Sequence, residues 1–178
     1  MTKHEPTVAR YGTDDFADLY RSHYPRLVAA LRLAGATDPA DLAQEAFART
    51  LRHWRRARHG SNPAGYVATT AFRLLRRGHR RESSILLDDA HALSPSPEAA
   101  MVVAMTVRQA LAAMPPRRRE CAVACLYLDM SAEEASQALG VSPSTVRVQL
   151  HRARNDLRAA LTDPPAEPSL NRGAGSGR

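Results

Sequence analysis

The chain reads SAEEASQALGVSPSTVRVQLHRAR from residue 131 to residue 154, which has the signals of two helices joined by a sharp turn. Ser131 and Glu134 have the spacing of a capping box, in which each side chain accepts a backbone N–H at the start of a helix. Gly140 is the residue type that ends a helix in the left-handed conformation. Ser142, followed by a proline, favours the start of a second helix. We therefore predict a short helix, a glycine turn and a longer helix.

The second of these helices has two distinct faces. Its apolar residues recur at helical spacing: Val146, Leu150, Ala153 and Leu157. Its other face carries hydrogen-bonding and basic residues: Arg147, Gln149, His151, Arg152 and Arg154. This pattern is typical of a helix-turn-helix, whose second helix lies in the DNA major groove. An ordinary helical hairpin with a solvated basic face fits the same pattern.

The composition favours a nucleic acid as partner. The chain has 178 residues, which is enough for one medium or two small domains, and a formal net charge of +7. A polyanion is the natural partner of such a charge, and nucleic acid is favoured over a membrane surface. Aromatic residues make up only 5%, which is low for a protein that binds RNA by stacking on its bases.

The sequence has no signal of an enzyme, a metal site or a cofactor. No phosphate-binding loop, nucleophile elbow, zinc-protease motif or dinucleotide fingerprint occurs. Cys121 and Cys125 have poor zinc spacing, and we interpret them as small buried hydrophobes. No apolar run of about 18 residues and no signal-peptide core occur, so we expect a cytoplasmic protein without membrane insertion.

The N-terminal half begins with two predicted helices. An amphipathic pattern runs from Asp14 to Gly35, and residues 38–41 (DPAD) have the signals of a second helix start. We expect that second helix to run to Arg58 with Leu42, Ala46, Phe47, Leu51 and Trp54 facing inward. Its outer face begins with Asp41, Gln44 and Glu45, which favours a basic protein partner over DNA. An acidic first turn that complements the helix dipole also explains Asp41.

A long stretch that carries only positive charge follows the start of this helix. Residues 46–81 contain no acid, whereas arginine occurs at positions 49, 52, 55, 56, 58, 73, 76, 77, 80 and 81. The phosphate groups of a nucleic acid would neutralise this concentration of positive charge. The alternative is a basic face that is simply solvated. A break at residues 59–63 predicts a new helix from about Ala64, with these residues inward: Tyr66, Val67, Thr70, Ala71, Leu74 and Leu75.

The predicted architecture is all-α, with two small helical domains joined by a flexible linker. We expect a flexible arm at residues 1–13, a helical domain at 14–82, and a linker at 83–100, where acids and prolines return and periodicity fades. The helix-turn-helix domain follows at 101–162. The tail at 163–178 is rich in Pro, Gly and Ser and is expected to be disordered.

Two stretches, in this order, resemble the bacterial RNA polymerase sigma factors of the extracytoplasmic-function (ECF) type. From Phe16 to Arg81 the chain resembles their region 2, and DLAQEAF at residues 41–47 is the most specific part. The C-terminal piece resembles their region 4 through LGV at 139–141, TV at 145–146 and HRAR at 151–154. The resemblance implies that region 2 binds core RNA polymerase and the promoter −10 element, and that region 4 binds the −35 element.

The resemblance also implies roles for individual residues. The residues expected to bind the clamp helices of the polymerase are Asp41, Leu42, Gln44, Glu45 and Phe47, the last mainly structural. Those expected at the −35 element are Ser144, Thr145, Arg147, Val148, Gln149, His151, Arg152 and Arg154. Those expected at the −10 element and in strand separation are Arg73, Arg76, Arg77, Arg80 and Arg81. An anti-sigma protein is a further partner that the family admits.

The chain departs from the family pattern at the −10 positions. Arg73 and Arg77 stand where the family usually has an asparagine and then an aspartate, and Tyr66-Val67 replaces the commoner Trp-Leu pair. The −10 sequence preference therefore does not carry over. Two other functions remain open: an operator-binding regulator that does not engage polymerase, and a decoy that binds polymerase without opening DNA. The first would need a dimer and a palindromic site.

Overall fold

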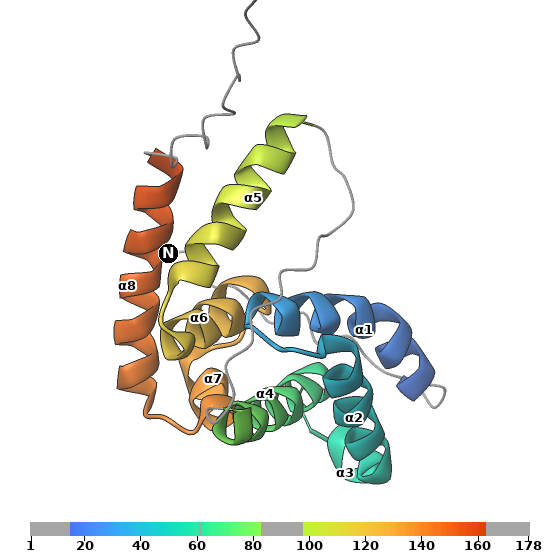
Figure 1. Ribbon diagram of the computed structural model, residues 1–178. Coiled ribbons are helices and arrows are strands. Elements are labelled where there is room, and N and C mark those ends of the chain that lie inside the picture. Colours follow the sequence, from blue (N-terminus) through green and yellow to red (C-terminus); the bar gives the residue numbers. More distant parts are fainter. Residues whose placement is uncertain (1–14, 61, 83–97, 163–178) are drawn as a thin grey trace, which may run out of the picture.

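The structure is a computed structural model that describes residues 15–60, 62–82 and 98–162. The described residues form helices and no strand, which confirms the all-α prediction (Figure 1). The helices are α1 (Asp15–Leu33), α2 (Pro39–Arg52), α3 (Trp54–Arg58), α4 (Pro63–Glu82), α5 (Glu98–Ala113), α6 (Pro116–Ala122), the π-helix η1 (Val123–Tyr127), α7 (Ala132–Leu139) and α8 (Pro143–Thr162). The expected arm, most of the expected linker and the expected tail lie outside the described residues.

Local signals in the sequence account for the start of α2 but not for its end. The side chain of Asp38 accepts the backbone N–H of Asp41 at 3.0 Å, and a proline occupies the first turn, as predicted. The predicted single helix to Arg58 is wrong, because α2 ends at Arg52 and His53 separates it from α3. The basic end of this segment therefore lies on a separate short helix.

The buried face of α2 is displaced from the predicted one. Ala43, Ala46, Phe47 and Thr50 are buried, whereas Leu51 is 53% exposed. Thr50 takes the buried position, and its hydroxyl is not left without a hydrogen bond there, because it donates to the carbonyl of Ala46 at 2.8 Å. Aromatic rings from α1 complete this core, with edge-to-face contacts to Phe47.

The buried face of α4 also differs from the expected one. Phe72 is fully buried, although the predicted inward set omits it, and Tyr66, which belongs to that set, is 38% exposed. Val67, Ala71 and Leu75 are buried as predicted. Phe72 is buried because α4 packs against α1, α2 and α7, so its buried stripe is wider than a two-helix contact requires.

The helix-turn-helix has the predicted local geometry. Ser131 Oγ accepts the backbone N–H of Glu134 at 3.1 Å, and Glu134 Oε2 accepts the backbone N–H of Ser131 at 2.9 Å. Gly140 ends α7 at φ 58°, which confirms the predicted left-handed turn. Helix α5 begins at Glu98, three residues before the start of the helix-turn-helix domain expected from the sequence at residue 101.

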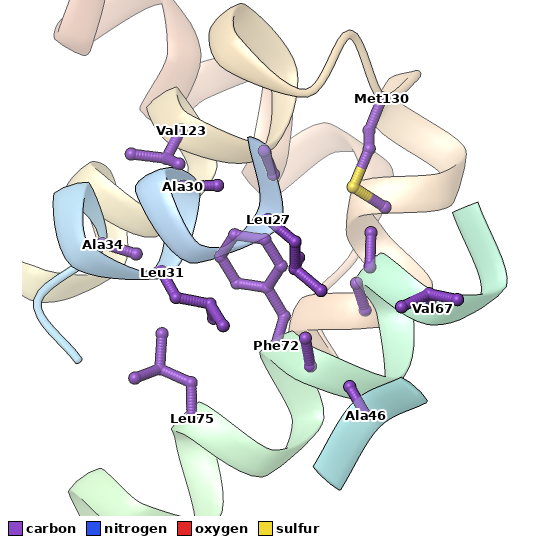
Figure 2. Packing of buried hydrophobic residues seen from close by; sticks show 14 of the residues in the cluster. Leu27, Ala30, Leu31, Ala34, Ala46, Val67, Phe72, Leu75, Val123 and Met130 are labelled. Atoms are coloured by element: carbon purple, nitrogen blue, oxygen red, sulfur yellow. The ribbon is translucent and has the colours of Figure 1, made fainter. Parts of the chain in front are cut away.

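The N-terminal bundle (α1–α4) and the C-terminal bundle (α5–α8 with η1) share a hydrophobic cluster, and a second, smaller cluster lies inside the C-terminal bundle. Helix α7 packs against α4, and η1 packs against α1. Figure 2 shows Phe72 next to Leu27 at the centre of the shared cluster, with Val123 and Met130 of the C-terminal bundle in the same cluster. The sequence predicts two linked units, and it contains no sign that they pack together.

Candidate nucleic-acid interface

The N-terminal end of α8 is fixed by its cap and its buried face. Ser142 Oγ accepts the backbone N–H of Thr145 at 3.1 Å and lies 2.8 Å from the hydroxyls of Ser144 and Thr145. Val146 and Ala153 have no exposed surface. The cap and the two buried side chains fix the rotation of α8 about its axis. The face of α8 opposite Val146 and Ala153 is therefore the one exposed to solvent.

The outer face of α8 carries most of the residues predicted to read DNA. Six of the eight are exposed: Ser144, Arg147, Val148, His151, Arg152 and Arg154. Thr145 and Gln149 are partly buried. Arg147 forms an ion pair with Glu133 of α7, which holds its guanidinium beside the first helix of the motif. Arginine and glutamine suit base edges, and serine and threonine suit phosphates, so this face can serve for both kinds of contact.

Helix α2 presents the predicted protein-binding face at its start. Asp41 and Gln44 are exposed, and Leu42 and Glu45 are partly buried. Glu45 forms an ion pair with Arg49 one turn later. Phe47 is only 2% exposed, so the structure places it in the core beneath this surface. The exposed group is thus acidic and polar, within a protein of net positive charge.

The arginines of α4 lie beside the helix-turn-helix. Arg73 Nη2 donates to the carbonyl of Gln137 in α7 at 3.3 Å. The guanidinium of Arg76 lies against Gly140, where an added Cβ would be 2.5 Å from its Nη1. Arg77 is exposed. The side chains of Arg80 and Arg81 lie outside the described part of the chain.

A second basic cluster lies on the end of α2 and on α3. Its members are all exposed: Arg52, Arg55, Arg56 and Arg58. All four lie in the acid-free stretch of residues 46–81, but none of them is among the residues predicted to bind DNA. Three of them lie on the separate helix α3 because of the break at His53, which sequence periodicity does not reveal. The described residues contain no group of three or more His, Cys, Asp or Glu able to hold a metal ion.

The capping carboxylate of Glu134 has a pKa below its ordinary value. Desolvation by partial burial raises this pKa, but three hydrogen bonds outweigh it, from the Ser131 backbone, the Asn62 side chain and the Ser131 side chain. A group with a lowered folded-state pKa contributes stability above its unfolded pKa and loses it as the pH falls through the folded value. Acid should therefore weaken this end of α7.

Glu134→Gln is expected to make the free energy of unfolding depend less steeply on pH in the acidic range. Below about pH 4.5, the ordinary pKa of the group, the free energy of unfolding of the wild type should fall more steeply than that of the variant. Glutamine keeps the capping-box acceptor but does not titrate. Urea unfolding of both proteins between about pH 3 and pH 7 measures the difference. Parallel curves would contradict the prediction, because other groups titrate in both proteins.

No helix in the three described ranges is long and apolar enough to cross a membrane. Burial raises the pKa of the Cys121 thiol to about 12, followed by smaller effects of Cys125 and Glu120, so the thiol stays protonated at neutral pH. Both cysteines are free, and only Cys121 is fully buried. Neither one contributes to the surfaces described above.

Two protein families match the two halves of the chain. Residues 19–85 match the family described as sigma-70 region 2, and residues 104–157 match the family described as sigma-70, region 4. The first match begins within α1 and runs through α4, and the second covers most of α5 through the greater part of α8. The two bundles of the structure thus correspond to the two matched families.

Three curated relatives are similar to the chain. The ECF RNA polymerase sigma factor SigE of Mycolicibacterium smegmatis is 32% identical over 84% of this chain, which spans 63% of that relative. The RNA polymerase sigma factor YlaC of Bacillus subtilis is 26% identical over 88% of this chain and 98% of its own length. The ECF RNA polymerase sigma factor ShbA of Streptomyces griseus is 44% identical over 29% of this chain, which spans 27% of ShbA.

Two solved structures share the fold. The sigma factor RpoE of Bartonella quintana, solved in complex with the anti-sigma factor NepR, superposes with a TM-score of 0.68 over 85% of this chain and 99% of its own, at 22% identity. CnrH, solved in complex with the cytosolic domain of CnrY, gives a TM-score of 0.59 over 85% of this chain and 90% of its own, also at 22% identity. At this identity the likeness concerns the fold.

Proposed function

The chain belongs to the sigma-70 family, as a sigma factor of the ECF type, and from this premise we propose that it binds core RNA polymerase and directs it to promoters. One observation carries the proposal: a single chain holds a DNA-reading helix-turn-helix and, on a separate bundle, an exposed acidic helix start. An operator-binding regulator needs the first surface but has no use for the second. We assign the protein to the cytoplasm, where polymerase and chromosome meet.

The two surfaces have different proposed roles, one in binding DNA and one in binding the polymerase. The outer face of α8 reads the −35 duplex in the major groove, and the start of α2 docks on the polymerase. Basic residues of α3 and α4 hold the phosphates of the −10 strand, because an exposed cluster of one sign attracts a polyanion. The polymerase catalyses RNA synthesis, so the proposed role of this chain is to recognise the promoter sequence and not to catalyse a reaction.

Arg152→Ala is expected to weaken binding to a −35 duplex by about 1–3 kcal/mol, mainly at one base position. The side chain is exposed on the outer face of α8, where a guanidinium can form two hydrogen bonds with a guanine. Fluorescence anisotropy with a set of single-base duplex variants measures the loss at each position. An equal loss on every duplex would instead assign Arg152 to a phosphate.

Run-off transcription tests the proposed function directly. Purified protein, core RNA polymerase and a library of promoter fragments should give discrete transcripts that core polymerase alone does not produce. No transcripts with DNA binding intact would favour the operator-binding regulator. Polymerase binding without transcripts would favour the decoy, which the arginines at positions 73 and 77 make a specific alternative.

A further inference from the structure

An apolar side chain lies on the face of α8 that is predicted to read DNA. Val148 is 49% exposed, and it is the one large apolar side chain that is exposed within residues 143–154 of α8. Single exposed apolar residues are common on protein surfaces and need no special explanation there. Val148 differs from such residues because its exposed neighbours on α8 are polar or basic, so its exact position on the helix is informative.

Val148 lies opposite the buried side of α8. Successive residues of an α-helix are turned by about 100°, so Val148 lies about 160° from Val146 and about 140° from Ala153. Neither of those two residues has exposed surface. Helix α8 packs against α5, α6 and α7 and lies at the edge of the described helices (Figure 1). Val148 is therefore at the centre of the outer face, which is the part of the helix that lies deepest in a groove.

Short side chains lie at the centre of this face, and a long one lies at its side. Ser144 precedes Val148 by one helical turn and is also exposed. Arg147 is turned to one side, where its guanidinium forms an ion pair of 2.5 Å with Glu133 of α7. A long side chain can reach bases or phosphates from a distance, whereas a short one needs the helix backbone to come close to the base edges. The centre of the face is thus shaped for a close approach.

The fold itself gives no reason for a valine at position 148. Neither hydrophobic cluster of the described residues includes this side chain. A β-branched residue is also a weaker helix former than alanine, so valine does not strengthen α8. An apolar side chain that is exposed in the free protein gains free energy when a partner covers it. The partner of Val148 should therefore offer an apolar group where the helix comes closest to it.

We propose that Val148 is a specificity-determining residue that contacts the 5-methyl group of one thymine in the −35 duplex. Among the four bases, thymine alone presents a methyl group in the major groove, and the other base edges offer hydrogen-bond donors and acceptors. Cytosine at the same position would present an amino group, for which valine has no acceptor. The inference rests on the proposed function in that α8 must read duplex DNA, and it adds the base and the chemical group that one residue reads.

Replacement of thymine by deoxyuridine tests the contact, because it removes the methyl group and leaves the base pair intact. At one thymine the wild-type chain should lose affinity about fourfold, which is the effect of burying one methyl-sized group. Val148→Ala should bind the thymine duplex about fourfold more weakly than the wild type, and it should bind the thymine and uracil duplexes equally well. The two changes are thus expected to be non-additive.

The probe is a duplex that the full chain selects from a randomised library, so its choice does not depend on polymerase. Each thymine is replaced in turn, and fluorescence anisotropy measures the affinity of each protein for each duplex. Leu161→Ala is the matched control, since Leu161 is 48% exposed on the same helix but lies near its C-terminal end. This variant should keep the full methyl effect. Circular dichroism checks that both variants are folded.

The outcomes separate this inference from the proposed function. Equal affinity of the wild type for every thymine and uracil duplex would overturn the inference. A methyl effect that persists in Val148→Ala would also overturn it, because another residue would then contact the methyl group. If the chain selects no duplex, DNA reading by α8 fails and the inference fails with it. If the methyl effect depends on Val148 but core polymerase does not bind the chain, the polymerase function fails while the thymine contact stands.

Discussion

Asp41→Arg combined with Glu45→Arg is expected to abolish promoter-specific run-off transcripts. Asp41 is exposed and Glu45 partly so at the start of α2, and the change turns this acidic face basic. Like charges brought together at an interface cost several kcal/mol, and each 1.4 kcal/mol is a factor of about ten, so we expect at least a roughly hundredfold loss of core polymerase affinity. Run-off assays and direct measurement of core binding both test the expectation.

A matched control separates this effect from damage to the fold. Glu45 is paired with Arg49, so the double change also removes an ion pair within a helix. Asp18→Arg removes a similar ion pair within a helix, with Arg21 three residues later on α1. Exposed pairs of this kind contribute under about 1 kcal/mol, so the control should remain active. Transcript levels of the double variant within about threefold of the control would refute the assigned surface.

Phe72→Ala is expected to lower the free energy of unfolding by about 3–5 kcal/mol. Phe72 has no exposed surface and lies at the centre of the core that both bundles share, next to Leu27 (Figure 2). Truncation removes the transfer free energy of the ring and leaves a cavity that several helices would have to fill. Urea unfolding followed by circular dichroism measures the loss, and both bundles should unfold in one transition.

Two controls define what the Phe72 result means. Phe72→Leu keeps most of the volume and should cost less than half as much as the alanine change. Val148→Ala, at a side chain 49% exposed on α8, should change the stability by less than about 0.5 kcal/mol. A loss below about 1 kcal/mol at Phe72, or two separate unfolding transitions, would show that the bundles do not stabilise each other.

Local patterns predicted the helix caps and the exposed face of α8 better than they predicted the buried faces of α2 and α4. The capping box at Ser131, the left-handed turn at Gly140 and the cap at Asp38 were all predictable, because each depends on residues within about four positions of one another. Five of the residues predicted for the −35 element lie on the outer face of α8 from Arg147 onward, since helical periodicity alone separates them from Val146 and Ala153.

The remaining differences come from contacts between distant parts of the chain. Leu51 is exposed because Thr50 takes the buried position, which depends on where α1 lies against α2. The role of Phe72 depends on the packing of α1, α2 and α7 against α4. The basic residues Arg55 and Arg56 lie on a separate short helix because α2 ends at Arg52. None of these follows from the spacing of residues along the chain.

The sequence by itself determined the helical class, the helix-turn-helix, the charged faces and, through its motifs, the sigma-70 family. Only the tertiary structure decided that the two bundles share a hydrophobic cluster and that Arg73 and Arg76 of α4 lie beside the helix-turn-helix. The physical reason is the range of the interactions. Caps and periodicity act over one or two helical turns, whereas the Asn62–Glu134 bond joins residues 72 positions apart, whose proximity depends on the packing of every helix between them.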